Sequence, residues 1–223
     1  MMECRASVGA VLFDMDGVLV DTESQYTSFW TDEGRRYFPE DMDFAVRLKG
    51  QTLTRIFELY FPNDELSQQA IKGRLESFEQ QMSYPLYAGG MELVTSLRKR
   101  GIKVAVVTSS NRAKMSCLYA THPYFIKQFD RVFTAEDFAH SKPDPDPYLT
   151  VARYFGLGPE SCVVIEDSLG GVRSGQAAGM PVIGVATTLP AQTLQPYCSL
   201  VVPGIHCLTV DDINKVLTLC KGD

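Results

Sequence analysis

Short apolar runs alternate with amphipathic helical segments through most of this 223-residue chain, and this alternation restricts the fold more than any other feature. Strands joined by helical crossovers run parallel and are buried on both faces. The pattern therefore predicts an α/β fold with a doubly wound, Rossmann-like parallel sheet. The expected strands are residues 8–13, 103–108, 129–134, 161–167, 180–186 and 199–203, and the expected helices between and after them are 91–101, 111–120, 145–156, 168–179 and 209–220.

The segment between the first two strands has a different pattern. From about residue 22 it shows long helical spacings and many aromatic residues, with no convincing strand. Apolar residues at helical spacing predict a small bundle of three or four helices. We therefore expect a core domain made of residues 1–20 and 88–223, and a small all-helical domain, residues 21–87, inserted after the first strand.

Two carboxylates follow the first strand directly. Asp14 and Asp16 are two residues apart, so a regular strand would direct both side chains to the same side. Each negative charge then disfavours ionisation of the other, and a bound cation would resolve the conflict. Gly17 allows the chain to turn sharply, and Asp21 or Thr22 could cap a helix that begins near Glu23. The alternative is an ordinary strand end with surface aspartates.

Further polar residues stand where later strands end. The second strand ends at Thr108, Ser109 and Ser110, Lys142 lies in the loop after the third, and Glu166 and Asp167 end the fourth. In open parallel sheets, ligands bind outside the carboxyl ends of the strands. Carboxylates, hydroxyls and one lysine at this edge predict a site for a divalent cation, Mg²⁺ by its preference for oxygen ligands, and for phosphate. Taken singly, these residues could instead be helix caps or exposed side chains.

Composition excludes several other classes of protein. A net charge of −6 without a basic stripe argues against nucleic-acid binding. No apolar run reaches the roughly 18 residues that a membrane helix needs, and the N-terminal segment is unlike a signal peptide, so we expect a cytoplasmic protein without a membrane partner. The six cysteines form no metal-binding or redox pattern and are expected to be reduced thiols, and a structural or solvent-exposed role is favoured for each of the three histidines.

Four segments, in order, resemble the haloacid dehalogenase superfamily of phosphotransferases, and the resemblance covers nearly the whole chain. They are DMDGV (14–18), VVTSSN (106–111), SKPDP (141–145) and VVIEDSLGGVRSGQAAGMPVIGV (163–185). The helical insertion resembles the cap of the subgroup that contains phosphoglycolate phosphatase, sugar-phosphate phosphatases and β-phosphoglucomutase. An acid at position 16 favours phosphoryl chemistry over dehalogenation.

The resemblance implies a role for each residue at the strand ends. Asp14 would be the nucleophile that becomes an aspartyl-phosphate, and Asp16 the general acid and base, with its backbone carbonyl on the metal. Thr108 and the Ser109 N–H would hold the phosphoryl oxygens, and Lys142 would neutralise charge. Two further residues, Glu166 and Asp167, complete the expected magnesium site together with Asp14 and Asp16.

The resemblance does not decide whether water or a sugar hydroxyl accepts the phosphoryl group from Asp14. In the mutase, a histidine follows the acid/base aspartate by ten residues and an arginine follows the LKG turn, whereas this chain has Tyr26 and Leu53 there. These differences favour a phosphatase that acts on a small phosphorylated metabolite, with a β-phosphoglucomutase-type mutase as the alternative. A signalling receiver that keeps its phosphoryl group is a hypothesis from another class. The expected substrate contacts in the cap are Tyr26, Lys49, Gly50 and Gln51. We expect the protein to be a monomer, with a homodimer as the alternative.

Overall fold

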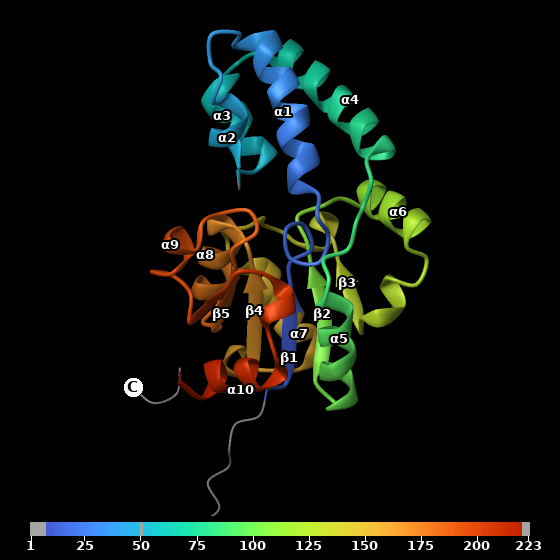
Figure 1. Ribbon diagram of the computed structural model, residues 1–223, viewed down its shortest axis with the longest axis vertical. Coiled ribbons are helices and arrows are strands. Elements are labelled where there is room, and N and C mark those ends of the chain that lie inside the picture. Colours follow the sequence, from blue (N-terminus) through green and yellow to red (C-terminus); the bar gives the residue numbers. More distant parts are fainter. Residues whose placement is uncertain (1–7, 50, 220–223) are drawn as a thin grey trace, which may run out of the picture.

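A computed structural model describes residues 8–49 and 51–219 of the chain. Its centre is a parallel six-stranded sheet with the strand order β3-β2-β1-β4-β5-β6 (Figure 1). The predicted α/β doubly wound fold is confirmed. The strands are β1 (Ala10–Phe13), β2 (Lys103–Val107), β3 (Arg131–Phe133), β4 (Cys162–Glu166), β5 (Val182–Val185) and β6 (Leu200–Val202).

Helices cover both faces of this sheet, because alternate strand residues point to opposite sides and both sides are apolar. One buried cluster joins the strands to α5, α6 and α10, and the other joins them to α7, α8 and α9. The bounds of these helices are α5 (Gly90–Lys99), α6 (Arg112–Thr121), α7 (Asp146–Phe155), α8 (Leu169–Ala177), α9 (Ala191–Leu194) and α10 (Val210–Leu219). Short 3₁₀ turns occur at η1 (Ile126–Gln128), η2 (Ala135–Asp137), η3 (Pro159–Ser161) and η4 (Ile205–Cys207).

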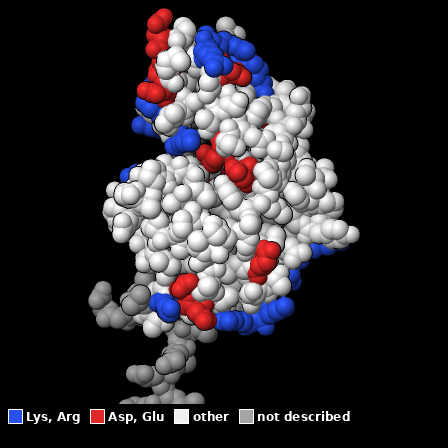
Figure 2. Space-filling model, in the orientation of Figure 1, with Lys and Arg blue, Asp and Glu red and all other residues white. Residues whose placement is uncertain are grey.

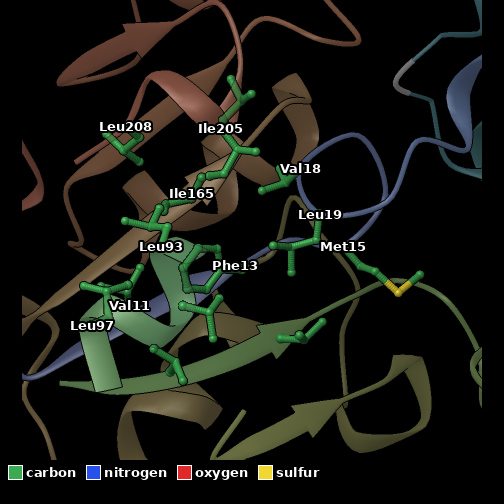
Figure 3. Close-up of a cluster of buried hydrophobic side chains, with 14 of the residues drawn as sticks. Val11, Phe13, Met15, Val18, Leu19, Leu93, Leu97, Ile165, Ile205 and Leu208 are labelled. Carbon is green, nitrogen blue, oxygen red and sulfur yellow. The ribbon is translucent and has the colours of Figure 1, made fainter. Parts of the chain in front are cut away.

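The larger apolar cluster reaches from the sheet to the loop that follows β1 (Figure 3). Phe13 at the end of β1 is fully buried, and so are Met15 and Leu19 in the loop itself. These buried side chains anchor the loop to the apolar cluster of the sheet. Consequently Asp14 and Asp16, which alternate with them, are held at the edge of the sheet rather than on a free loop.

Helices α1–α4 form a separate group at one end of the molecule (Figure 1). They are α1 (Glu23–Tyr37), α2 (Phe44–Leu48), α3 (Leu53–Tyr60) and α4 (Glu65–Gln81), and they share their own buried cluster of mainly aromatic side chains. Two connecting segments link this group to the sheet and pair with each other, since Asp21 N–H donates to Pro85 O and Tyr87 N–H donates to Leu19 O. This arrangement supports the proposed division into a core domain and an inserted cap near residues 21 and 88.

Local details differ from the sequence-based expectations. Strand β1 begins at Ala10 rather than Val8, and Thr22 does not cap α1 with its side chain. Its hydroxyl donates instead to Asp16, so the prediction of a capping role was wrong. Within the described ranges, Cys117, Cys162, Cys198 and Cys207 are free thiols, and none of the helices combines the length and apolar character needed to span a membrane.

Candidate active site

The carboxyl ends of the strands form the floor of a cavity of about 620 Å³, and the helical cap forms its roof. Asp14, Thr108 and Asp167 line the floor, whereas Lys49 and Gln51 line the roof. Acidic side chains gather at the waist between the cap and the sheet, beside basic ones (Figure 2). The cavity therefore joins polar groups from segments far apart in the sequence.

Lys142 is the central cation of the floor. Its buried Nζ lies 2.6 Å from Asp14 Oδ1 and 2.7 Å from Glu166 Oε1, and it also donates to the Val107 carbonyl oxygen at 2.9 Å. Three acceptors for three N–H bonds satisfy the ammonium group completely. Lys142 thus fixes the side chain of Asp14 relative to that of Glu166.

Glu166 is held on both of its oxygens. Tyr148 on α7 donates its hydroxyl to Oε1 at 2.9 Å, and Oε2 accepts from the backbone N–H of Asp167 and of Ser168. The ring of Tyr148 also faces Lys142 Nζ, 5.0 Å from the ring centroid. Tyr148 is not among the site residues predicted from the sequence. Its position one turn into the helix that follows the Lys142 loop is the signal that could have suggested it.

Three carboxylates lie close enough together to hold one metal ion. Oxygen atoms of Asp14, Glu166 and Asp167 are all within 4.8 Å of one another. All three side chains are buried, and Lys142 supplies only one positive charge. Two negative charges would therefore remain uncompensated if the three groups were ionised, and a divalent cation with oxygen ligands fits this set.

The same cluster shifts the acidity of its members. Burial raises the pKa of Asp14 to about 7, although Lys142 opposes the shift. Burial, followed by the charges of Glu166 and Asp14, raises the pKa of Asp167 well above its usual value. Burial alone would lower the pKa of Lys142, but Asp14 and Glu166 raise it well above the ordinary range. A metal ion bound by Asp14 and Asp167 would therefore compete with protons for these two carboxylates.

Asp16 faces different partners from those of Asp14. Its Oδ1 accepts from the Thr22 hydroxyl at 2.5 Å and from Lys114 Nζ at 2.7 Å, and its Oδ2 accepts from the Ser110 hydroxyl at 2.8 Å. Burial favours the neutral acid, but Lys114 and the hydroxyl donors together hold the pKa of Asp16 below its usual value. A regular strand would direct both carboxylates to one side, but β1 ends at Phe13, and the side chains of Asp14 and Asp16 contact different lysines, Lys142 and Lys114.

The hydroxyl residues after β2 lie on the same floor. Thr108 is 1% exposed, and its Oγ1 accepts from the backbone N–H of Ser110 at 3.0 Å. Ser109 is exposed and lines the cavity. Thr108 and Ser109 could therefore contact an anion that is bound in the cavity beside Asp14.

The predicted cap contacts lie partly at the cavity. Tyr26, Lys49 and Gln51 line it, whereas Gly50 lies outside the described residues. Tyr26 donates its hydroxyl to Glu79 at 2.7 Å. The Oε1 of Gln51 is buried without a hydrogen-bond partner among the described residues, so it is available to accept a hydrogen bond from a bound molecule.

Comparison with known proteins identifies the family. Residues 11–185 match the family of haloacid dehalogenase-like hydrolases. The chain belongs to this family. The predicted resemblance and the expectation of a hydrolase of the haloacid dehalogenase type are thereby confirmed. The match extends from β1 to β5 and includes the residues after β1, β2, β3 and β4 that line the cavity floor.

Individual relatives of this haloacid dehalogenase-like chain differ in the activity that their names give. Hexitol phosphatase A of Escherichia coli is 37% identical over 197 residues, covering 86% of this chain and 87% of that protein. Beta-phosphoglucomutase of Bacillus subtilis is 29% identical over 195 residues, covering 81% and 84%. The chain spans only 20% of protein SUPPRESSOR OF QUENCHING 1 of Arabidopsis thaliana, to which it is 32% identical over 216 residues, 92% of this chain.

Solved structures support the fold of this haloacid dehalogenase-like hydrolase. A family IA, variant 3 hydrolase of Entamoeba histolytica has a TM-score of 0.79 and 22% identity, with 93% of this chain and 98% of that chain covered. At this identity the likeness concerns the fold alone. It agrees with a parallel-sheet core that carries a helical cap.

Proposed function

We propose that this chain is a magnesium-dependent phosphatase that hydrolyses a small phosphomonoester, such as a sugar phosphate, through an aspartyl-phosphate on Asp14. One observation carries the proposal: Asp14 is bound by Lys142 and shares a potential metal site with Glu166 and Asp167 on the floor of the cavity. Two relatives support the substrate class, since they are named hexitol phosphatase A and fructose-1-phosphate phosphatase YqaB.

The first step uses Asp14 as the nucleophile. Its carboxylate oxygen attacks phosphorus, an O–P bond forms, and the bond from phosphorus to the alcohol oxygen breaks. Lys142, 2.6 Å from Asp14 Oδ1, offsets negative charge on this carboxylate and on the phosphoryl group. Thr108 and the Ser109 N–H would hold the phosphoryl oxygens.

Asp16 serves both steps in this proposal. Because Lys114 and the hydroxyl donors hold the pKa of Asp16 low in the free protein, Asp16 would take up a proton when the substrate binds. It would give this proton to the departing alcohol and afterwards take one from the water that hydrolyses the aspartyl-phosphate. The bound Mg²⁺, held by Asp14, Glu166, Asp167 and the Asp16 carbonyl, would supply electrostatic stabilisation of the phosphoryl charge. The cap would shield the first step from bulk water, because its helices roof the cavity.

A mutase of the β-phosphoglucomutase type is the second candidate, because the Bacillus subtilis relative is named beta-phosphoglucomutase. Tyr26 argues against it. The tyrosine hydroxyl is engaged by Glu79, and its ring lies against Lys114, so no group there resembles the histidine of the mutase pattern. A receiver that retains its phosphoryl group is disfavoured by the roofed cavity, which suits a small substrate.

Phosphate release from a panel of phosphorylated metabolites, with glucose 1-phosphate isomerisation measured in parallel, tests the proposal. We expect release that stops in excess chelator and returns with Mg²⁺. Asp14→Asn should lose phosphate release, whereas Asp32→Asn, at an exposed site on α1, should keep it. Isomerisation without release would favour the mutase, and a stable phosphorylated protein without turnover would favour the receiver.

A further inference from the structure

Lys114 is a buried cation that no motif explains. It lies in the first turn of α6 and is only 5% exposed. Its Nζ is 2.7 Å from Asp16 Oδ1, and it faces the ring of Tyr26 with 4.6 Å to the centroid. Burying an ammonium group is costly unless it is paired, and here a carboxylate and an aromatic face provide the compensation.

The helix does not need a lysine at this position to fold. The adjacent Met115 and the nearby Leu118 anchor α6 to the apolar cluster of the sheet, whereas Lys114 faces Asp16 and the ring of Tyr26 at the cavity. Replacing buried ion pairs by apolar residues is often neutral or stabilising in proteins. A purely structural role therefore accounts poorly for this charge.

Lys114 completes the set of donors around Asp16. Thr22 comes from the segment that leads into the cap, Ser110 from the loop after β2, and Lys114 from α6. Three donors from three separate elements leave the carboxylate one orientation. In that orientation Asp16 lines the cavity but is not one of the three carboxylates, Asp14, Glu166 and Asp167, that lie close enough to share one metal ion.

We propose that Lys114 is a positioning residue, which holds the Asp16 carboxylate in the orientation from which it serves the alcohol side of the reaction. This inference rests on the proposed phosphatase function and assigns a role to a residue outside the family motifs. Lys114 acts through Asp16, because its shortest contact is to that carboxylate. A residue of this kind affects the chemical step more than substrate binding.

Substrates with different leaving groups distinguish positioning of Asp16 from a direct role of Lys114 in substrate binding. An alkyl alcohol leaves poorly without a proton donor, whereas a nitrophenol leaves readily as the anion. The ratio kcat/KM reports only the steps up to departure of the alcohol, so hydrolysis of the aspartyl-phosphate does not enter. Loss of Asp16 positioning should therefore lower kcat/KM for alkyl phosphates selectively.

The experiment compares wild type, Lys114→Met, Asp16→Asn and the double variant, each with the best alkyl phosphate of the metabolite panel and with 4-nitrophenyl phosphate. We expect Lys114→Met to lower kcat/KM for the alkyl phosphate about 10- to 100-fold, with little change in KM and less than about 3-fold loss for the aryl phosphate. In the Asp16→Asn background, Lys114→Met should cause no further loss, since a residue that acts only through another is non-additive with it.

Controls keep the result interpretable. Lys99→Met removes an exposed lysine of α5 and should change neither rate. Circular dichroism shows whether Lys114→Met is folded. If Lys114→Met is not folded, Lys114→Gln takes its place in the experiment. Glutamine is neutral but of similar reach, and this variant is expected to show the same selectivity.

Each other outcome overturns the inference. A raised KM with kcat unchanged would mean that Lys114 binds substrate directly, and equal losses on both substrates or additivity with Asp16→Asn would mean a role independent of Asp16. If wild type releases no phosphate, the proposed function fails together with the inference. If Asp16→Asn shows the selective loss and Lys114→Met does not, only the inference fails.

Discussion

Gly17 and Asp167 approach so closely that no side chain fits between them. A Cβ atom at Gly17 would lie 1.8 Å from Asp167 Oδ2, and the backbone φ of this glycine is +76°. The hydroxyl of Thr188 donates to the same Oδ2, and it would lie 2.7 Å from the same Cβ atom. The glycine after the DMD motif therefore lets the loop after β1 close over a carboxylate of the proposed metal site.

Gly17→Ala should displace Asp167 and weaken the proposed magnesium site. We expect at least a tenfold rise in the Mg²⁺ concentration for half-maximal phosphate release, together with about 1–2 kcal/mol of lost stability from the positive φ. Titration of activity with Mg²⁺ and denaturant unfolding measure the two effects.

Gly101→Ala is the matched control for this change. Gly101 has a φ of +77°, and a Cβ there would meet nothing within 4 Å. It should lose similar stability but keep the Mg²⁺ dependence of wild type. If both variants needed an equally raised Mg²⁺ concentration for half-maximal phosphate release, backbone strain rather than contact with Asp167 would cause the effect.

Tyr148→Phe should impair the site without unfolding it. The change removes the hydroxyl that donates to Glu166 Oε1 at 2.9 Å but keeps the ring beside Lys142. Hydrogen bonds to charged groups contribute about 1.5–3 kcal/mol, so we expect about a tenfold lower kcat/KM and a loss of about 2 kcal/mol in stability. Tyr154→Phe alters the same helix at a side chain that is 56% exposed, and it should match wild type in both measurements.

The sequence was sufficient for the sheet and for its acidic edge, because these depend on local patterns. Apolar runs such as Val104–Val107 give strands, and parallel strands bring their carboxyl ends to one edge. The direction of Asp16 and its pairing with Lys114 could not be predicted in this way. They depend on how far the chain departs from a strand after Phe13 and on which face of α6 meets the cap, and both are set by packing between distant segments.

Arg74→Met should destabilise the cap. Arg74 donates to both oxygens of the buried Glu33, at 2.7 and 2.6 Å, and to the Tyr37 hydroxyl at 3.0 Å. Removing Arg74 leaves the buried carboxylate of Glu33 with only the more distant Arg36 as a charged partner, but the Arg74 side chain is itself 32% exposed, so we expect a loss of about 1–3 kcal/mol. Denaturant unfolding gives this value, and limited proteolysis should show earlier cleavage in the cap than in the core.

Arg36→Met provides the comparison for the cap, since Arg36 also approaches Glu33. Its NH1 atom is 3.8 Å from Glu33 Oε1 and its side chain is 52% exposed. Exposed ion pairs contribute about 0–1 kcal/mol, so this variant should unfold almost like wild type. A loss as large as that of Arg74→Met would contradict the assignment of the buried pair to Arg74.

The raised pKa of Asp14 makes the stability of the metal-free protein depend on pH. Because burial raises this pKa from 3.8 to about 7, the folded state binds more protons than the unfolded state between these values. The free energy of unfolding should therefore fall as pH rises through this window, by up to about 1.4 kcal/mol for each unit of pKa difference.

Urea unfolding of wild type and Asp14→Asn at several pH values from 4 to 8, in chelator, measures the contribution of Asp14. Wild type should lose stability relative to the variant as pH rises, and saturating Mg²⁺ should reduce that loss because the ion binds the deprotonated carboxylate. A wild-type minus variant difference that stays constant with pH would contradict a raised pKa at Asp14.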